Sequence, residues 1–123
     1  MDYVPMIWGA GANNSIGTIY NNGYRYLLAY NEPDLGNQSN MSVSTVVGYW
    51  PLFTAYDFHL GAPVTAQNPA WTDTTGGKWF INFANSIDMS TVDFIPIHVY
   101  AGNYGGVGAA NWFLTDIVIQ IGL

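Results

Sequence analysis

The stretch Arg25-Tyr26-Leu27-Leu28-Ala29-Tyr30-Asn31-Glu32-Pro33-Asp34 joins a nearly continuous apolar run to an abrupt polar end. An apolar run without polar alternation is typical of a parallel strand that is covered on both faces. Pro33 has no backbone N–H and therefore cannot continue the hydrogen-bond ladder of a central strand. The sequence thus predicts a buried parallel strand over residues 26–31, with Glu32 at its C-terminal end.

Three further apolar stretches predict strands over residues 4–8, 60–64 and 92–100. Apolar residues at helical spacing predict helices over 15–22, 41–58, 79–87 and 109–121. Pro51 should kink or end the second helix, and Pro96 should bring a bulge or a break into the fourth strand. The alternation of strand and helix predicts an α/β fold with a parallel sheet and right-handed crossovers.

The length of the chain bounds this architecture. It has 123 residues, about half of the roughly 250 that a complete TIM (β/α)8 barrel needs. No internal repeat or linker interrupts the sequence. We therefore expect a single partial domain over residues 1–123, with about four parallel strands of a barrel and the helices between them.

The composition excludes several classes of partner. The formal net charge is −6, with Arg25 and Lys78 as the basic side chains, so there is no basic patch for nucleic acid or anionic lipid. No apolar run approaches the roughly 20 residues that span a bilayer, so no membrane partner is expected. The first residues lack the pattern of a signal peptide and cysteine is absent, which leaves the cellular location undecided.

Glu32 is the single glutamate in the chain, and it follows the strand predicted over residues 26–31. In α/β barrels the C-terminal ends of the strands build the active site. A partly desolvated carboxyl group there would have a raised pKa and would act as a general acid near neutral pH, as glycosidic bond cleavage requires. The alternative is a structural carboxylate at the start of a helix, where it interacts with the helix dipole.

His98 and Tyr100 lie two residues apart near the end of the fourth predicted strand, so their side chains share one face. They could orient a carboxylate and contact sugar hydroxyls, but a packed core histidine and tyrosine are equally compatible with the pattern. Neither His98 nor His59 has the neighbours of a metal site, so no metal and no cofactor is expected.

Aromatic side chains are abundant and divide into two groups. Trp8 ends a predicted strand, and its ring is the strongest candidate to stack on a sugar; Trp71, Tyr104 and Trp112 are weaker candidates. Trp50 and Trp79 lie at helical spacing among apolar residues, which favours core packing over ligand binding.

Four segments together carry a resemblance to a known family. They are Val4-Pro5-Met6-Ile7-Trp8-Gly9, Leu27-Leu28-Ala29-Tyr30-Asn31-Glu32-Pro33-Asp34, Gln38-Ser39-Asn40-Met41-Ser42 and Val92-Asp93-Phe94-Ile95-Pro96-Ile97-His98-Val99-Tyr100. In this order and spacing they resemble glycoside hydrolase family 128 of clan A, the glycosyl hydrolase catalytic core group known for endo-β-1,3-glucanases. The resemblance covers nearly the whole chain and implies roughly barrel strands three to six.

The resemblance also implies roles for individual residues. Glu32 would be the acid/base at the end of strand four, Asn31 would hold the 2-hydroxyl of the sugar, and His98 and Tyr100 would line the site from strand six. The family's nucleophile is a second glutamate in a Thr-Glu-Phe-like motif on strand seven, and nothing in this sequence matches it. Asp116 falls inside an apolar helix pattern, which favours a structural role.

Two positions depart from the family pattern. Val99 stands where the family usually has an aromatic residue, and Pro96 where it usually has a small one. Both departures lie in the strand that carries His98 and Tyr100, so they bear on the shape of the sugar subsite.

The sequence therefore predicts a partial glycoside hydrolase domain that lacks the N-terminal strands and the strand of the nucleophile. Its parent enzyme would be secreted or associated with the cell wall and would hydrolyse β-1,3-glucan with retention, while the isolated chain would be inactive or nearly so. Its partner would be a β-glucan polysaccharide or oligosaccharide. The alternatives are a carbohydrate-binding remnant without catalysis and a self-associating structural protein. We do not expect a stable monomer, because a barrel opened after four strands leaves two parallel edges unpaired, and two copies could pair edge to edge as a homodimer.

Overall fold

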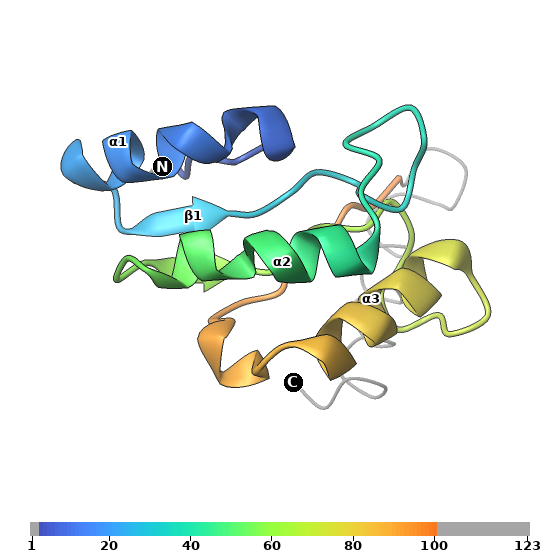
Figure 1. Cartoon of the computed structure of the whole chain (residues 1–123). Helices are drawn as coiled ribbons and strands as arrows, with labels where there is room; N and C mark the ends of the chain where they lie inside the picture. The colour runs from blue at the N-terminus through green and yellow to red at the C-terminus, as the bar shows by residue number, and fades with distance from the viewer. Residues whose placement is uncertain (1–2, 101–123) are drawn as a thin grey trace.

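The computed structural model of the chain describes residues 3–100 (Figure 1). Two short strands and three α-helices alternate along the chain, with a 3-10 helix at each end of this series. The elements are η1 (Ala10–Ser15), α1 (Ile16–Asn21), β1 (Tyr26–Leu28), α2 (Val43–Thr54), β2 (His59–Gly61), α3 (Thr75–Ser86) and η2 (Met89–Thr91). The predicted α/β class is therefore correct.

All strand pairing among residues 3–100 is parallel. Strands β1 and β2 pair in the register Tyr26↔His59, Leu27↔Leu60 and Leu28↔Gly61. Isolated parallel bridges extend this arrangement on both sides and beyond the strand ends: Met6↔Leu28, Asn31↔Val64 and Gly61↔Phe94. The four predicted strand segments thus lie side by side in sequence order, as consecutive strands of a barrel do.

Two of the four predicted strands are much shorter than expected. The segments 4–8 and 92–100 each contribute a single bridge residue, Met6 and Phe94, to the parallel arrangement. In the second segment, residues 95–100 continue without regular structure. Pro96 explains part of this, because a residue without an N–H cannot donate to a ladder.

Phe94 approaches β2 closely because the facing residue is a glycine. A Cβ atom on Gly61 would lie 2.7 Å from Cε2 of Phe94 and 3.2 Å from Cδ2 of Leu28. The rings of Tyr26 and His59 stack nearby, with their centroids 4.6 Å apart. Paired residues of neighbouring strands share a face, and we call this one the inner face; its residues are Met6, Tyr26, Leu28, His59, Gly61 and Phe94.

Local capping explains where the two long helices begin. The Ser42 hydroxyl accepts a hydrogen bond from Thr45 N at the start of α2, and the Thr74 hydroxyl accepts one from Gly77 N at the start of α3. Such caps satisfy amide groups that have no partner within the helix. The cap at Thr74 starts α3 at Thr75, four residues before the start predicted at residue 79.

Pro51 does not end α2, which was one of the two predicted outcomes. The helix runs on to Thr54, and Ala55 N donates to the carbonyl of Pro51 across the next turn. The residue is exposed, and in a helix interior it removes one hydrogen bond without removing those that follow. The helix does end four residues before the predicted position at Phe58.

The core lies between the parallel segments and helices α2 and α3. From the strands it receives Leu27, Ala29, Leu60 and Ala62, and from the helices Val46, Trp50, Phe53, Trp79, Phe80 and Phe83. The indole N–H of Trp50 donates to Thr91 Oγ1 at 2.9 Å, and that of Trp79 to the carbonyl of Met41 at 2.8 Å. The predicted core role of both tryptophans is confirmed, since their only polar atom is satisfied inside the fold.

In Figure 1 α1 and α2 flank β1, and α3 packs beside α2. Ile16 of α1 belongs to the same core cluster as Val46 of α2 and Phe80 of α3, so the three helices cover the same face of the parallel segments. Within residues 3–100 no helix is long and apolar enough to cross a membrane. The predicted helix over 109–121 lies outside the described residues.

Candidate active site

Glu32 directly follows the Asn31↔Val64 bridge, at the C-terminal end of the β1 segment. Its backbone N–H donates to the carbonyl of Val64 at 2.7 Å, and its own carbonyl accepts from Leu35 N at 3.1 Å. The φ angle of Glu32 is +43°, in the left-handed region that non-glycine residues rarely adopt. Hydrogen bonds on both sides hold this unusual conformation, which turns the chain sharply at the strand end.

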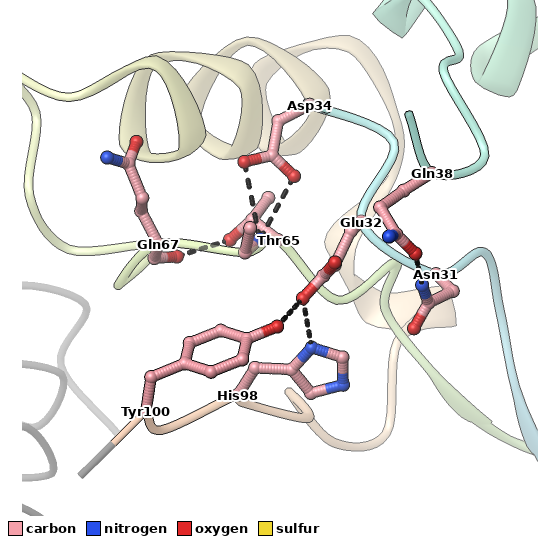
Figure 2. A network of polar contacts seen from close by, with 9 residues as sticks. Asn31, Glu32, Asp34, Gln38, Thr65, Gln67, His98 and Tyr100 are labelled. Atoms are coloured by element: carbon pink, nitrogen blue, oxygen red, sulfur yellow. Dashed lines mark hydrogen bonds and ion pairs between the residues drawn. The ribbon is translucent and has the colours of Figure 1, made fainter. Parts of the chain in front are cut away.

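The carboxyl group of Glu32 is nearly inaccessible and meets two side chains from the far end of the described chain (Figure 2). The relative exposure of Glu32 is 4 %. Its Oε1 atom lies 2.7 Å from Nδ1 of His98 and accepts a hydrogen bond from the hydroxyl of Tyr100. These partners are 66 and 68 residues away in the sequence. The structure thus brings together three of the five predicted site residues.

The pKa of Glu32 is lowered, which corrects the sequence-based expectation of a raised value. Burial raises the pKa of this carboxyl, but the hydrogen bonds from Tyr100 and His98, with the charge of His98, outweigh that effect. Both partners stabilise the ionised form, because each places a donor hydrogen on the same oxygen. In the reverse direction, Glu32 and burial raise the pKa of Tyr100 to about 12, so its hydroxyl stays a donor at neutral pH.

Asn31 and Trp8 lie beside this cluster. Asn31 N donates to the carbonyl of Trp8 at 3.0 Å, and the Asn31 side-chain amide donates to Oε1 of Gln38 at 3.0 Å (Figure 2). Trp8 is half exposed, at 50 %. Its backbone therefore belongs to the strand-end arrangement, while its ring is open to a ligand.

Asp34 is the residue near the site that the sequence reasoning did not single out. Both of its carboxylate oxygens accept from Ala66 N, at 3.0 and 3.3 Å. Burial raises the pKa of Asp34 although hydrogen bonds from the amides of Ala66 and of Asp34 itself lower it, and the charge of Glu32 adds to the rise. Its place directly after Glu32-Pro33 was the one signal available in the sequence.

The described residues thus offer one carboxyl group that is buried, hydrogen-bonded and placed to exchange a proton. No group of three or more histidine, cysteine or acidic side chains in the described part of the chain is arranged to hold a metal ion. The open side of the cluster is formed by the extended segment of Ile97, His98, Val99 and Tyr100, which borders a shallow pocket.

Comparisons with known proteins give this arrangement a context. The family described as "Glycosyl hydrolase catalytic core" matches residues 1–117. A comparison with curated proteins finds no match.

Among solved structures, the chain is similar to a family 128, subgroup I, endo-β-1,3-glucanase from Amycolatopsis mediterranei in complex with laminaritriose, with 33 % identity and a TM-score of 0.81. It is also similar to a subgroup II endo-β-1,3-glucanase from Sorangium cellulosum, with 28 % identity and a TM-score of 0.69. A third is a subgroup III curdlan-specific exo-β-1,3-glucanase from Blastomyces gilchristii, with 26 % identity and a TM-score of 0.69.

The alignments cover 97 %, 99 % and 99 % of this chain but 50 %, 52 % and 53 % of the three solved chains. The chain therefore spans about half the length of these enzymes. The family match over most of the sequence and the likeness over nearly all of it agree with each other. The chain belongs to the glycosyl hydrolase catalytic core family and, within it, to glycoside hydrolase family 128.

Proposed function

We propose that Glu32 is the general acid/base of a retaining β-1,3-glucan hydrolase, and that this chain supplies roughly strands three to six of its barrel. The observation that carries the proposal is the buried Glu32 carboxyl at a strand end, with His98 and Tyr100 on one oxygen. The related Amycolatopsis enzyme has been solved with laminaritriose, and glutamate variants of it with laminaripentaose and laminarihexaose. A β-1,3-linked glucan is therefore the proposed substrate.

Retaining hydrolysis needs a second carboxylate about 5 to 5.5 Å from the first. In the first step the nucleophile bonds to the anomeric carbon, the glycosidic C–O bond breaks, and Glu32 gives its proton to the departing oxygen. In the second step Glu32 takes a proton from water, whose oxygen displaces the nucleophile from the sugar. Glu32 is the one glutamate of the chain, and both carboxylate oxygens of Asp34 accept the N–H of Ala66, so we assign the nucleophile to a carboxylate outside residues 3–100.

The lowered pKa of Glu32 fits this division of the site. With His98 and Tyr100 alone, Glu32 is ionised, which is the state that acts as a base in the second step. A second carboxylate at the distance that retention requires would raise the pKa of Glu32, because two like charges so close cannot both ionise easily. The acid form needed for the first step would then depend on the nucleophile. Alone, the chain should have little or no hydrolytic activity.

The remaining site residues take supporting roles in this proposal. Asn31 would bind the 2-hydroxyl of the sugar, and its amide is already oriented by Gln38 at 3.0 Å. Trp8 would offer its exposed ring as a stacking surface beside the strand end. His98 and Tyr100 would set the orientation and the charge state of Glu32.

A hybrid enzyme tests the catalytic role directly: residues 1–100 replace the equivalent part of the Amycolatopsis glucanase, and reducing ends released from laminarin are measured. Glu32→Gln should lower kcat by about 10²- to 10⁴-fold, the usual contribution of general acid catalysis. Asp88→Asn, an exposed carboxyl far along the chain, is the matched control and should leave activity unchanged. Glu32→Gln activity within threefold of the parent hybrid would remove Glu32 from the mechanism.

A carbohydrate-binding role without catalysis is the second candidate, and the exposed ring of Trp8 favours it. Titration of the 123-residue chain with laminaritriose, followed by tryptophan fluorescence, tests it. Binding that is lost in Trp8→Ala, together with an inactive hybrid enzyme, would support binding alone.

A further inference from the structure

A single carboxylate connects the two loops that follow β1 and β2. Asp34 lies in the loop after Glu32, and both of its oxygens accept the N–H of Ala66, at 3.0 and 3.3 Å. Ala66 lies two residues beyond Val64, whose carbonyl accepts the backbone N–H of Glu32 at 2.7 Å. Glu32 and Asp34 are thus attached to the same short segment of the neighbouring loop (Figure 2).

Glu32 needs such support because its backbone conformation is unfavourable. A φ angle of +43° in a residue with a Cβ atom persists where the surrounding structure fixes it. Between Glu32 and Asp34 stands Pro33, whose ring locks its own φ angle. Pro33 thus removes one of the backbone rotations between the two residues, so the position of Asp34 restricts that of Glu32.

The receiving segment is itself held by hydrogen bonds. The hydroxyl of Thr65 donates to the carbonyl of Gln67 at 2.7 Å, and Oε1 of Gln67 accepts from Gly76 N, in the first turn of α3, at 3.0 Å. A Cβ atom on Gly76 would lie 2.9 Å from Oδ2 of Asp34. The Asp34 carboxylate thus lies close against the first turn of α3 at Gly76.

We propose that Asp34 is a positioning residue, which holds the left-handed turn at Glu32 by accepting the amide of Ala66 and so keeps the Glu32 carboxyl against His98 and Tyr100. Its importance for catalysis rests on the function proposed above, but the positioning itself does not. The feature that acts is the hydrogen-bond acceptor; the negative charge is not required.

The single glutamate of the chain gives a direct measurement. In protein labelled with ¹³C-glutamate the carboxyl carbon of Glu32 yields one resonance, and its titration reports whether the carboxyl is still in contact with His98 and Tyr100. In the parent chain the midpoint should lie below the ordinary value. In Asp34→Ala the turn relaxes, and the midpoint should rise toward that of an exposed glutamate, about 4.3.

Two variants separate the hydrogen bond from its alternatives. Asp34→Asn keeps an acceptor for Ala66 without the charge, so its midpoint should stay at or below that of the parent. Asp88→Ala is the matched control. The carboxylate of Asp88 also accepts a backbone N–H, from Ser90 at 3.0 Å, but Asp88 is exposed and its hydrogen bond lies within η2, which does not contact Glu32. Its midpoint should equal that of the parent.

The outcomes decide the proposal whether or not the chain is an enzyme. An unchanged midpoint in Asp34→Ala overturns it, and so does an Asp34→Asn midpoint that rises as in Asp34→Ala. If Asp34→Ala does not fold, Asp34→Ser replaces it, since the serine oxygen stands about one bond farther from Ala66 N. The titration is independent of hydrolysis, so an inactive hybrid enzyme leaves this result intact.

Discussion

At the scale of single residues, the site depends on which groups surround one carboxyl. Burial alone would raise the pKa of Glu32, but the hydrogen bonds of Tyr100 and His98 to Oε1 lower it below its ordinary value. Hydrogen bonds to a charged form can outweigh desolvation when they come from preoriented groups, here His98 and Tyr100. The protonation state of Glu32 therefore depends on side chains 66 and 68 residues away.

Removing one of these donors should shift the titration of Glu32. Tyr100→Phe deletes the hydroxyl that donates to Oε1 and keeps the ring, so the pKa of Glu32 should rise. The ¹³C-glutamate titration described above measures it, with Tyr24→Phe, an exposed ring elsewhere, as the control. A midpoint that falls or stays constant would show that the Tyr100 contact does not form in solution.

The buried hydroxyl of Tyr30 should make the folded chain less stable at alkaline pH. Its side chain is fully buried, its hydroxyl donates to Asn13 at 2.7 Å, and burial raises its pKa to about 12. The unfolded state loses this proton near pH 10 while the folded state keeps it, so stability falls between pH 10 and about 12. From the two-unit difference the loss is on the order of 2 to 3 kcal/mol.

Urea unfolding at pH 8 and pH 11 checks this expectation. Tyr30→Phe should be less stable at pH 8, by about 0.5 to 1.5 kcal/mol for the lost hydrogen bond, but should lose less on going to pH 11. Tyr24→Phe should behave as the parent at both pH values. An equal loss in the parent and in Tyr30→Phe would assign the alkaline limit to other groups.

At the scale of the elements, two glycines in helices occupy opposite surroundings. In α2 a Cβ atom on Gly48 would meet nothing within 4 Å, whereas in α3 a Cβ on Gly77 would lie 1.9 Å from the carbonyl oxygen of Trp71. Glycine costs helix stability through its backbone entropy. Gly48 is therefore replaceable, while Gly77 permits the loop before α3 to fold back onto the helix.

Replacing each of these two glycines by alanine separates the effect of helix propensity from the effect of local packing. Gly48→Ala should stabilise the chain by about 0.5 to 1 kcal/mol. Gly77→Ala should destabilise it, by more than the same substitution gains at Gly48, because the obstacle is backbone. Thermal unfolding followed by circular dichroism measures both, and a stabilising Gly77→Ala would contradict the packing of the loop on α3.

At the scale of the whole molecule, the row of parallel segments ends in two edges. Within residues 3–100 the segment of Met6 pairs with β1 alone, and the segment of Phe94 pairs with β2 alone. The inner face between them carries exposed Tyr26 and partly exposed Leu28. Tyr30, two residues beyond Leu28, is buried and packs against Phe53 of α2, with ring centroids 5.3 Å apart.

We expect the isolated chain to self-associate, since unpaired strand edges and apolar surface favour pairing with a second copy. Size-exclusion chromatography with light scattering at micromolar concentration should give a mass above 13.5 kDa. Tyr26→Lys, which places a charge on the inner face, should shift the population toward the monomer, while Tyr49→Lys on α2 should not. A compact monomer that melts cooperatively would show that the inner face needs no partner.

The sequence by itself determined what local patterns control. The unbroken apolar run before Glu32 predicted a buried parallel strand, and the spacing of Trp50 and Trp79 placed both in the core, because apolar periodicity follows the backbone geometry of each element. The family resemblance implied one site for Glu32, His98 and Tyr100, and the structure brings these three side chains into contact.

Tertiary structure alone decided the rest. The length of the outer strands depends on partners elsewhere in the chain, so segments 4–8 and 92–100 shrank to single bridges although their composition favours strands. The direction of the Glu32 pKa and the Asp34–Ala66 contact both arise between residues more than 30 positions apart. Electrostatic interactions and hydrogen bonds depend on the distance between two groups in space. Residues that are far apart in the sequence come within that distance only when the elements pack together.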